Sequence, residues 1–256
     1  MALTPELILL GVLVGMILAG LLQHHFACIT LGRGAFTWPS RCESCGSQRP
    51  MSEHIPLIST GKLCSTCSHK LSPIILILQV SIITFSVWAF TTLSPLYAAQ
   101  ASLLWFSLLG IAYMDLRRWV IPNQFLAYLL FASLVGILFG PQEFRQSLMG
   151  LLVAGFVSLL IILPQRFGED DGTLSLGDVK LCFVVALWLG WILVTYTLLL
   201  ATILALISWL ISGLVKGFST KRRVPFGPFV ALSTMIFGMG RLMDPQFVSH
   251  LLTFRF

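Results

Sequence analysis

LLWFSLLGIAYMD at residues 103–115 and DVKLCFVVALWL at residues 178–189 are two apolar runs, each with an aspartate at one end. Asp115 closes the first run and Asp178 opens the second, in a chain that contains only five aspartates. A carboxylate at the edge of a hydrocarbon slab is costly to keep ionised, so such residues are rare and are usually paired, water-facing or functional. If the two carboxylates face each other at matching depth, they can share a proton as the pair in aspartic proteases does.

Composition places these runs in a membrane. Hydrophobic residues make up 57% of the chain and charged residues 10%, and the mean hydropathy is +0.91. A soluble domain carries about 25% charged residues. The first apolar stretch, residues 7–22, lacks the basic start of a signal peptide and is followed by Gln23, His24 and His25. We therefore expect it to be a first membrane span rather than a cleaved segment.

The lengths of the apolar runs predict the number of spans, since a span needs about 20 apolar residues. Residues 179–214 cannot be one span, because a helix rises about 1.5 Å per residue and this stretch is too long for a bilayer. Gly190, followed by Trp191, is the break within it. The predicted fold class is an all-α polytopic membrane protein with about eight transmembrane helices, at residues 6–22, 73–93, 96–114, 120–139, 147–163, 179–190, 191–214 and 226–240.

The basic residues predict the orientation, because cytoplasmic loops are enriched in Lys and Arg. With the N-terminus outside, 13 of the 16 Lys and Arg residues fall on the cytoplasmic side. The C-terminus then also lies outside, and both Asp115 and Asp178 lie at the cytoplasmic ends of their spans. Because the basic residues lie between apolar runs rather than in one patch, they indicate topology and no nucleic-acid partner.

Four cysteines in the polar segment of about 23–72 predict a metal site. They form two C-x-x-C pairs, and this spacing falls within the range of four-cysteine zinc sites. Each pair presents two thiolates on one side of a turn, and Gly46 directly follows the first pair, where a residue without Cβ is favoured. A reducing cytoplasm disfavours the alternative of disulfides, so structural zinc is preferred over disulfides or free thiols. The predicted ligands are Cys42, Cys45, Cys64 and Cys67.

Several short motifs resemble a known family, the prepilin peptidases or type IV leader peptidases. Asp115 is followed after six residues by Pro122 and Asn123, as in the family's first motif. Its second motif, Gly-x-Gly-Asp followed by Val-Lys, is met by Gly177, Asp178, Val179 and Lys180. The string PFGP at residues 225–228 and the twin C-x-x-C loop also look like the family's. The resemblance covers nearly the whole chain, in order.

The resemblance implies an activity. Prepilin peptidases are polytopic aspartyl proteases of the bacterial inner membrane, and they remove a short basic leader from type IV pilins and type II secretion pseudopilins. Many then methylate the new N-terminus with S-adenosylmethionine. By this resemblance Asp115 and Asp178 are the catalytic pair. Residues 1–95 would hold the first span, a zinc-stapled cytoplasmic loop and the second span, and residues 96–256 would form a six-span peptidase domain.

The chain also departs from the family pattern. Ser175 replaces the first glycine of the second motif, and uncharged Ala19, Ile74 and Gln79 stand where the family has Asn, Arg and Glu. These lost polar groups are ones expected to hold a cationic, carboxylate-bearing cofactor, so we predict cleavage without methylation.

The acidic triplet Glu169, Asp170 and Asp171 precedes the second motif and is a candidate for binding the basic leader. The alternative is a solvated loop face. For the two dyad aspartates, the alternative is that each marks a helix end, with Arg117 and Lys180 as counter-ions.

Two other functions stay open. A proton-coupled transporter would also carry aspartates in its spans, although nearer the midplane and with internal repeats, which this sequence lacks. A catalytically impaired zinc-loop membrane scaffold would be compatible with the departures from the family pattern.

Overall fold

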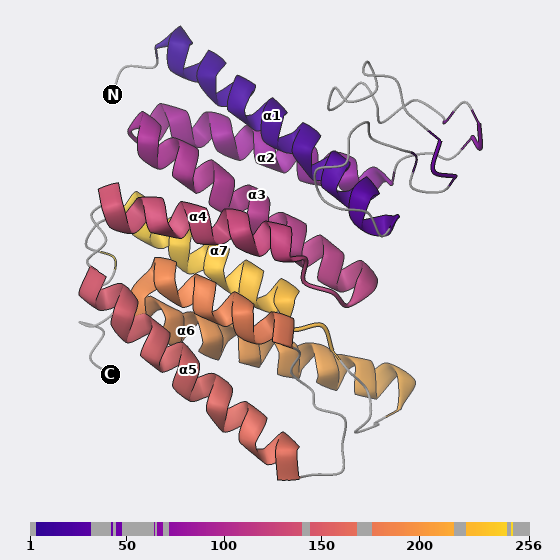
Figure 1. Ribbon diagram of the computed structural model, residues 1–256, viewed down its shortest axis with the longest axis vertical. Coiled ribbons are helices and arrows are strands. Elements are labelled where there is room, and N and C mark those ends of the chain that lie inside the picture. Colours follow the sequence, from indigo (N-terminus) through magenta and orange to yellow (C-terminus); the bar gives the residue numbers. More distant parts are fainter. Residues whose placement is uncertain are drawn as a thin grey trace. The chain divides into compact units, whose positions relative to one another are not determined.

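The computed structural model describes residues 4–31, 42, 45–47, 64, 66–68, 72–139, 144–167, 176–217, 224–244 and 247. Within these residues the chain is helical and has no strand, which confirms the predicted all-α class. Figure 1 shows the seven helices of this part: α1 (Pro5–Thr30), α2 (Pro73–Thr92), α3 (Pro95–Arg118), α4 (Asn123–Phe139), α5 (Phe144–Phe167), α6 (Leu176–Lys216) and α7 (Gly227–Met243).

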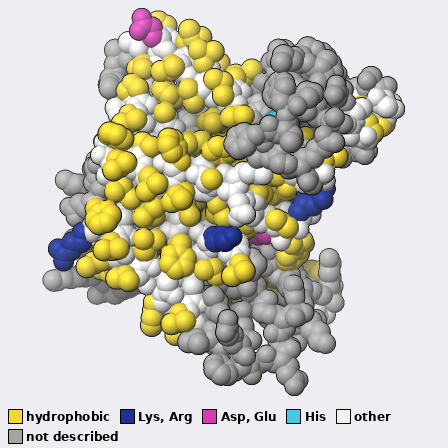
Figure 2. All heavy atoms as spheres, in the orientation of Figure 1, with side chains coloured by type: hydrophobic (Ala, Val, Ile, Leu, Met, Phe, Trp, Pro, Cys, Tyr) yellow, Lys and Arg dark blue, Asp and Glu magenta, His cyan; other side chains and the backbone are white. Residues whose placement is uncertain are grey.

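Four of the described helices are long and apolar enough to cross a membrane: α1, α2, α3 and the part Leu176–Val215 of α6. The apolar segments Asn123–Phe139, Phe144–Leu160 and Gly227–Met243 are shorter. Hydrophobic side chains cover much of the face seen in Figure 2. The chain is therefore a membrane protein by the length and composition of its helices, whereas the count of eight spans is not confirmed.

Helix α6 is interrupted at the glycine where the sequence predicts a break. Gly190 has φ 75° and ψ 177°, a conformation that non-glycine residues rarely adopt, and it separates helical residues 176–189 from 191–216. The guanidinium of Arg241 in α7 donates hydrogen bonds to the carbonyl oxygens of Trp188 (2.9 Å) and Leu189 (3.3 Å). These carbonyls end the first segment, where a helix lacks donors of its own.

The chain divides into two compact units, residues 1–110 and 111–256. In the first, α1 packs against α2, and the buried residues of α2 include Ile75, Ile82 and Ala89, which recur every seven positions on one helical face. Phe85 stacks on Trp105 of α3 with ring centroids 4.2 Å apart. In the second unit, α6 packs against α4, α5 and α7, so the helix that carries Asp178 is the central element of that unit.

Candidate functional site

Asp115 lies near the end of α3, and its side chain is only 5% exposed. Its Oδ2 accepts a hydrogen bond of 2.9 Å from the backbone N–H of Gly227, the first residue of α7. A buried carboxylate needs such a partner, since an ionised group buried without one is strongly destabilising. The N–H at the start of α7 therefore replaces the water molecule that would donate a hydrogen bond to an exposed carboxylate.

Asp178 lies in the first turn of α6 and is 6% exposed. Its place there is favourable, because the N-terminus of a helix carries a partial positive charge. The carboxylates of Asp115 and Asp178 interact electrostatically. The structure thus brings together, within residues 111–256, the two aspartates that the sequence singles out.

The motif residues around the two aspartates lie at the starts of α4 and α6. Pro122 precedes α4 and Asn123 begins it, and the amide oxygen of Asn123 lies 3.5 Å from the Nζ of Lys180, which donates to it. Gly177 is half-buried in the first turn of α6. This hydrogen bond therefore links the start of α4 to the N-terminal part of α6, the helix that carries Asp178.

Gly227 is a site residue that the sequence points to only indirectly. The string at residues 225–228 looks like the family's, but nothing in it indicates a contact with an aspartate 112 residues earlier in the chain. The candidate leader-binding residues Glu169, Asp170 and Asp171, and the variant motif position Ser175, lie outside the described residues.

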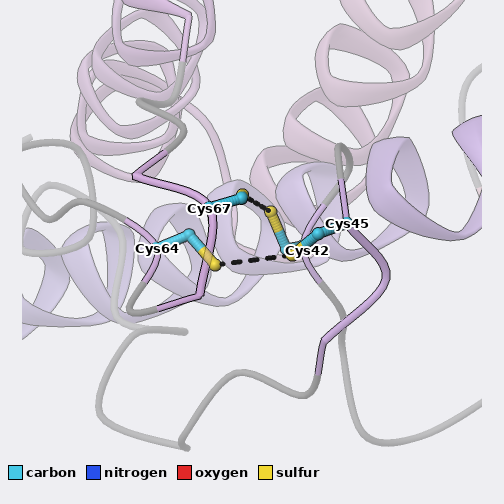
Figure 3. A group of neighbouring side chains, drawn as sticks. All are labelled: Cys42, Cys45, Cys64 and Cys67. Carbon is cyan, nitrogen blue, oxygen red and sulfur yellow. Dashed lines mark hydrogen bonds between the residues drawn. The ribbon is translucent and has the colours of Figure 1, made fainter.

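The four predicted cysteine ligands converge in the first unit. Their sulfur atoms all lie within 4.8 Å of one another, a group that could hold a metal ion. Figure 3 shows Cys42 beside Cys67 and Cys45 beside Cys64, with sulfur separations of 3.6 and 3.7 Å. In a tetrahedral zinc site with Zn–S bonds of about 2.3 Å, neighbouring sulfurs are about 3.8 Å apart. The donor set and its spacing therefore fit zinc.

The two C-x-x-C turns share one backbone geometry. The N–H of Gly46 donates to the carbonyl of Cys42, and the N–H of Ser68 donates to the carbonyl of Cys64, each at 2.9 Å. Both donors have positive φ, 71° for Gly46 and 54° for Ser68. The sequence predicts this conformation at Gly46, whereas the second turn uses a serine.

Thiol chemistry in the cluster favours metal binding. The pKa of Cys64 falls to about 5, chiefly through a hydrogen bond with the Ser47 hydroxyl and also through the backbone N–H groups of Thr66 and Cys67. The Ser47 oxygen lies 3.4 Å from the Cys64 sulfur. Because the thiolate is the form that binds metal, this environment prepares Cys64 as a ligand.

Together these features define a class of protein: a helical membrane protein with two buried, interacting carboxylates and a four-cysteine cluster. Comparison with known proteins shows which family the chain resembles. Residues 101–210, which include both aspartates, match the model of the type IV leader peptidase family.

Curated relatives agree with that match. The chain is 29% identical over 210 residues to the prepilin leader peptidase/N-methyltransferase of Dichelobacter nodosus, covering 78% of this chain and 71% of the relative. It is 26% identical over 203 residues to the one of Aeromonas salmonicida (77% and 69%) and 25% over 205 residues to the one of Pseudomonas aeruginosa (77% and 70%). No solved structure matches the chain. The resemblance to the prepilin peptidases is thereby confirmed.

Proposed function

We propose that this protein is a membrane-bound aspartic endopeptidase that removes the basic leader from type IV prepilins or type II secretion pseudopilins. The observation that carries the proposal is the pair of buried, interacting carboxylates of Asp115 and Asp178, inside the segment that matches the leader peptidase model. Two carboxyl groups at one site can supply a general base and a general acid for hydrolysis of a peptide bond.

The proposed chemistry uses the pair as a unit. One carboxylate takes a proton from water, which attacks the scissile carbonyl, while the other carboxyl donates a hydrogen bond or proton to the carbonyl oxygen. The roles then exchange as the tetrahedral intermediate collapses and the leaving amine is protonated. Because the groups interact, their titration belongs to the pair and not to either residue alone.

The proposed setting follows from the charge distribution of the chain. With 13 of 16 basic residues on the inner side, the positive-inside rule favours both termini outside and the aspartates at the cytoplasmic edge. The resemblance to prepilin peptidases implies that the membrane is the bacterial inner membrane. We assign hydrolysis to residues 96–256. A precursor whose leader is cytoplasmic and whose apolar helix is still in the bilayer would meet the site at that edge.

Zinc is proposed as a structural cofactor held by the four cysteines. Four thiolates close a tetrahedral site and leave no open position for substrate, so the metal would stabilise the loop and take no part in hydrolysis. The acidic triplet Glu169, Asp170 and Asp171 is proposed to attract the basic leader. Neutralising it should then raise KM at low salt only, and a defect that persists at high salt would contradict that role.

We propose that the protein has peptidase activity but does not transfer a methyl group. The relatives' names include N-methyltransferase, but Gln79 stands where the family has an acid, and its amide is used in a hydrogen bond of 3.1 Å to the Oε1 of Gln23. Both side chains are buried. Ala19, in place of the family's Asn, is also buried and offers no polar group.

The test is a cleavage assay read by mass spectrometry. Purified protein in detergent is mixed with a precursor that carries a basic leader, with S-adenosylmethionine present. The expected product is cut at the leader junction and has an unmodified N-terminus. A cleaved product that is heavier by one methyl group would contradict only the predicted lack of methyl transfer. The peptidase assignment would stand. If the wild-type protein produces no cleavage, the transporter and scaffold alternatives replace the peptidase.

A further inference from the structure

The first turn of α7 meets the side chain of Asp115 directly. The first N–H groups of a helix have no intrahelical acceptor, and no side-chain hydrogen bond from the N-cap residue Phe226 supplies one. The next residue, Pro228, has no N–H to offer. The N–H of Gly227 donates instead to Asp115 Oδ2, so a side chain from α3 caps the start of α7.

Gly227 also makes room for that carboxylate. A Cβ at this position would lie 2.8 Å from Asp115 Oδ2, 3.2 Å from its Cγ and 3.3 Å from its Cβ. All three atoms belong to one side chain, and the closest is its terminal oxygen. Any residue other than glycine would therefore displace the carboxylate, since rotating a side chain is easier than moving the helix backbone.

We propose that Gly227 is a positioning residue of the peptidase: its backbone N–H and its missing side chain together fix the carboxylate of Asp115 against Asp178. This inference rests on the proposed function. A hydrogen bond from a backbone N–H to a carboxylate is charge-assisted and short, so it holds one carboxylate oxygen in place. The orientation of the other oxygen, towards water or substrate, is then set by the start of α7.

The size of the expected effect follows from geometry. Misplacing a reacting group by about 1 Å can lower the rate about 10²-fold. Gly227→Ala should therefore reduce kcat about 10²-fold. The KM should stay within about twofold, because the change alters an interaction made in the transition state and not leader binding.

The matched control is Gly155→Ala in α5, in the same unit. A Cβ there would lie 3.5 Å from the ring of Phe183, an ordinary contact, so kcat and KM should both match wild type. If Gly227→Ala cleaves as fast as Gly155→Ala, or changes KM alone, positioning is refuted while the peptidase assignment stands. If wild-type protein does not cleave, the proposed function fails and the positioning role fails with it.

A second measurement tests the contact without using activity. Thermal unfolding in detergent is compared for Gly227→Ala, Asp115→Ala and the double variant. Because the added Cβ meets Asp115, Gly227→Ala should lower the melting temperature clearly in the presence of Asp115 and far less when Asp115 is alanine. Equal losses in both backgrounds would overturn the contact. If Gly227→Ala alone does not fold, recovery of folding in the double variant supports the contact between Gly227 and Asp115. Continued misfolding of the double variant overturns that contact.

Discussion

Several polar side chains inside the apolar helices find hydrogen-bond partners within the protein, whereas the hydroxyls of Ser86, Thr197 and Ser233 are buried without one among the described residues. Ser102, Ser107, Ser133 and Thr234 donate to the carbonyl four residues earlier in their own helix. Gln79, fully buried, donates from Nε2 to the Oε1 of Gln23. A lipid-facing helix has no water to serve such groups, so these hydrogen bonds lower the cost of burying the side chains that make them.

The Gln23–Gln79 pair gives a prediction at the scale of single residues. Gln79→Met alone should lower the free energy of unfolding by about 1–3 kcal/mol, because it leaves the buried amide of Gln23 without this partner. The double variant Gln23→Met/Gln79→Met should lie close to wild type, since both polar groups are then gone. Denaturant titration in detergent measures both values. A double variant as unstable as the sum of the single variants would contradict the pairing.

Some of these residue roles can be predicted from the sequence and others cannot. The sequence singles out Asp115 and Asp178 because an acid at the end of an apolar run is rare. From the sequence alone, Gln79 is recognised only as an uncharged residue at a position where the family has Glu. Its bond to Gln23 depends on how α1 packs against α2, across 56 positions of the chain, and no local pattern encodes that contact.

At the scale of single helices, α6 depends on a residue that is distant in the sequence. Its break at Gly190 is predictable from the length of the apolar run and from the glycine. The cap is not, because Arg241 lies 53 and 52 residues away from the two carbonyls it binds. A half-buried guanidinium on those carbonyls ends the first helical segment of α6, which carries Asp178, so it stabilises the helix that holds half of the proposed dyad.

Arg241→Met should therefore destabilise the protein by about 1.5–3 kcal/mol, the range for a hydrogen bond that involves a charged group. The control is Arg145→Met at the start of α5, where the side chain is exposed and the effect should stay within about 0.5 kcal/mol. Unfolding in detergent, followed by tryptophan fluorescence, gives both numbers. Equal stability of the two variants would show that the Arg241 hydrogen bonds contribute nothing.

For the whole molecule, the helical class, the break in α6 and the cysteine cluster follow from the sequence. The number of spans does not follow as directly, because α4 and α7 each have 17 residues, at the short end of what a bilayer requires. The two cysteine turns also differ in how well the sequence predicts them. The positive φ of the first turn is predictable because it falls on a glycine, Gly46, whereas that of the second turn falls on Ser68 and is not.

The four-cysteine cluster gives a prediction about the intact protein. Elemental analysis of protein purified without chelators should find close to one zinc per chain. Cys42→Ser or Cys64→Ser should release it, since a three-thiolate site is incomplete, while Cys28→Ala, outside the cluster, should retain it. Wild-type protein without zinc would contradict the structural-metal assignment.

The central claim is that Asp115 and Asp178 act jointly, and cleavage kinetics of their variants test it most directly. Asp115→Asn and Asp178→Asn should each lower kcat at least about 10²-fold, the usual loss for a general acid or base. The double variant should be no worse than either, because the two groups form one catalytic unit. Asp244→Asn, at the C-cap of α7, is the matched control and should cleave as wild type does. A single aspartate variant that retains more than about a tenth of the wild-type rate would contradict the claim.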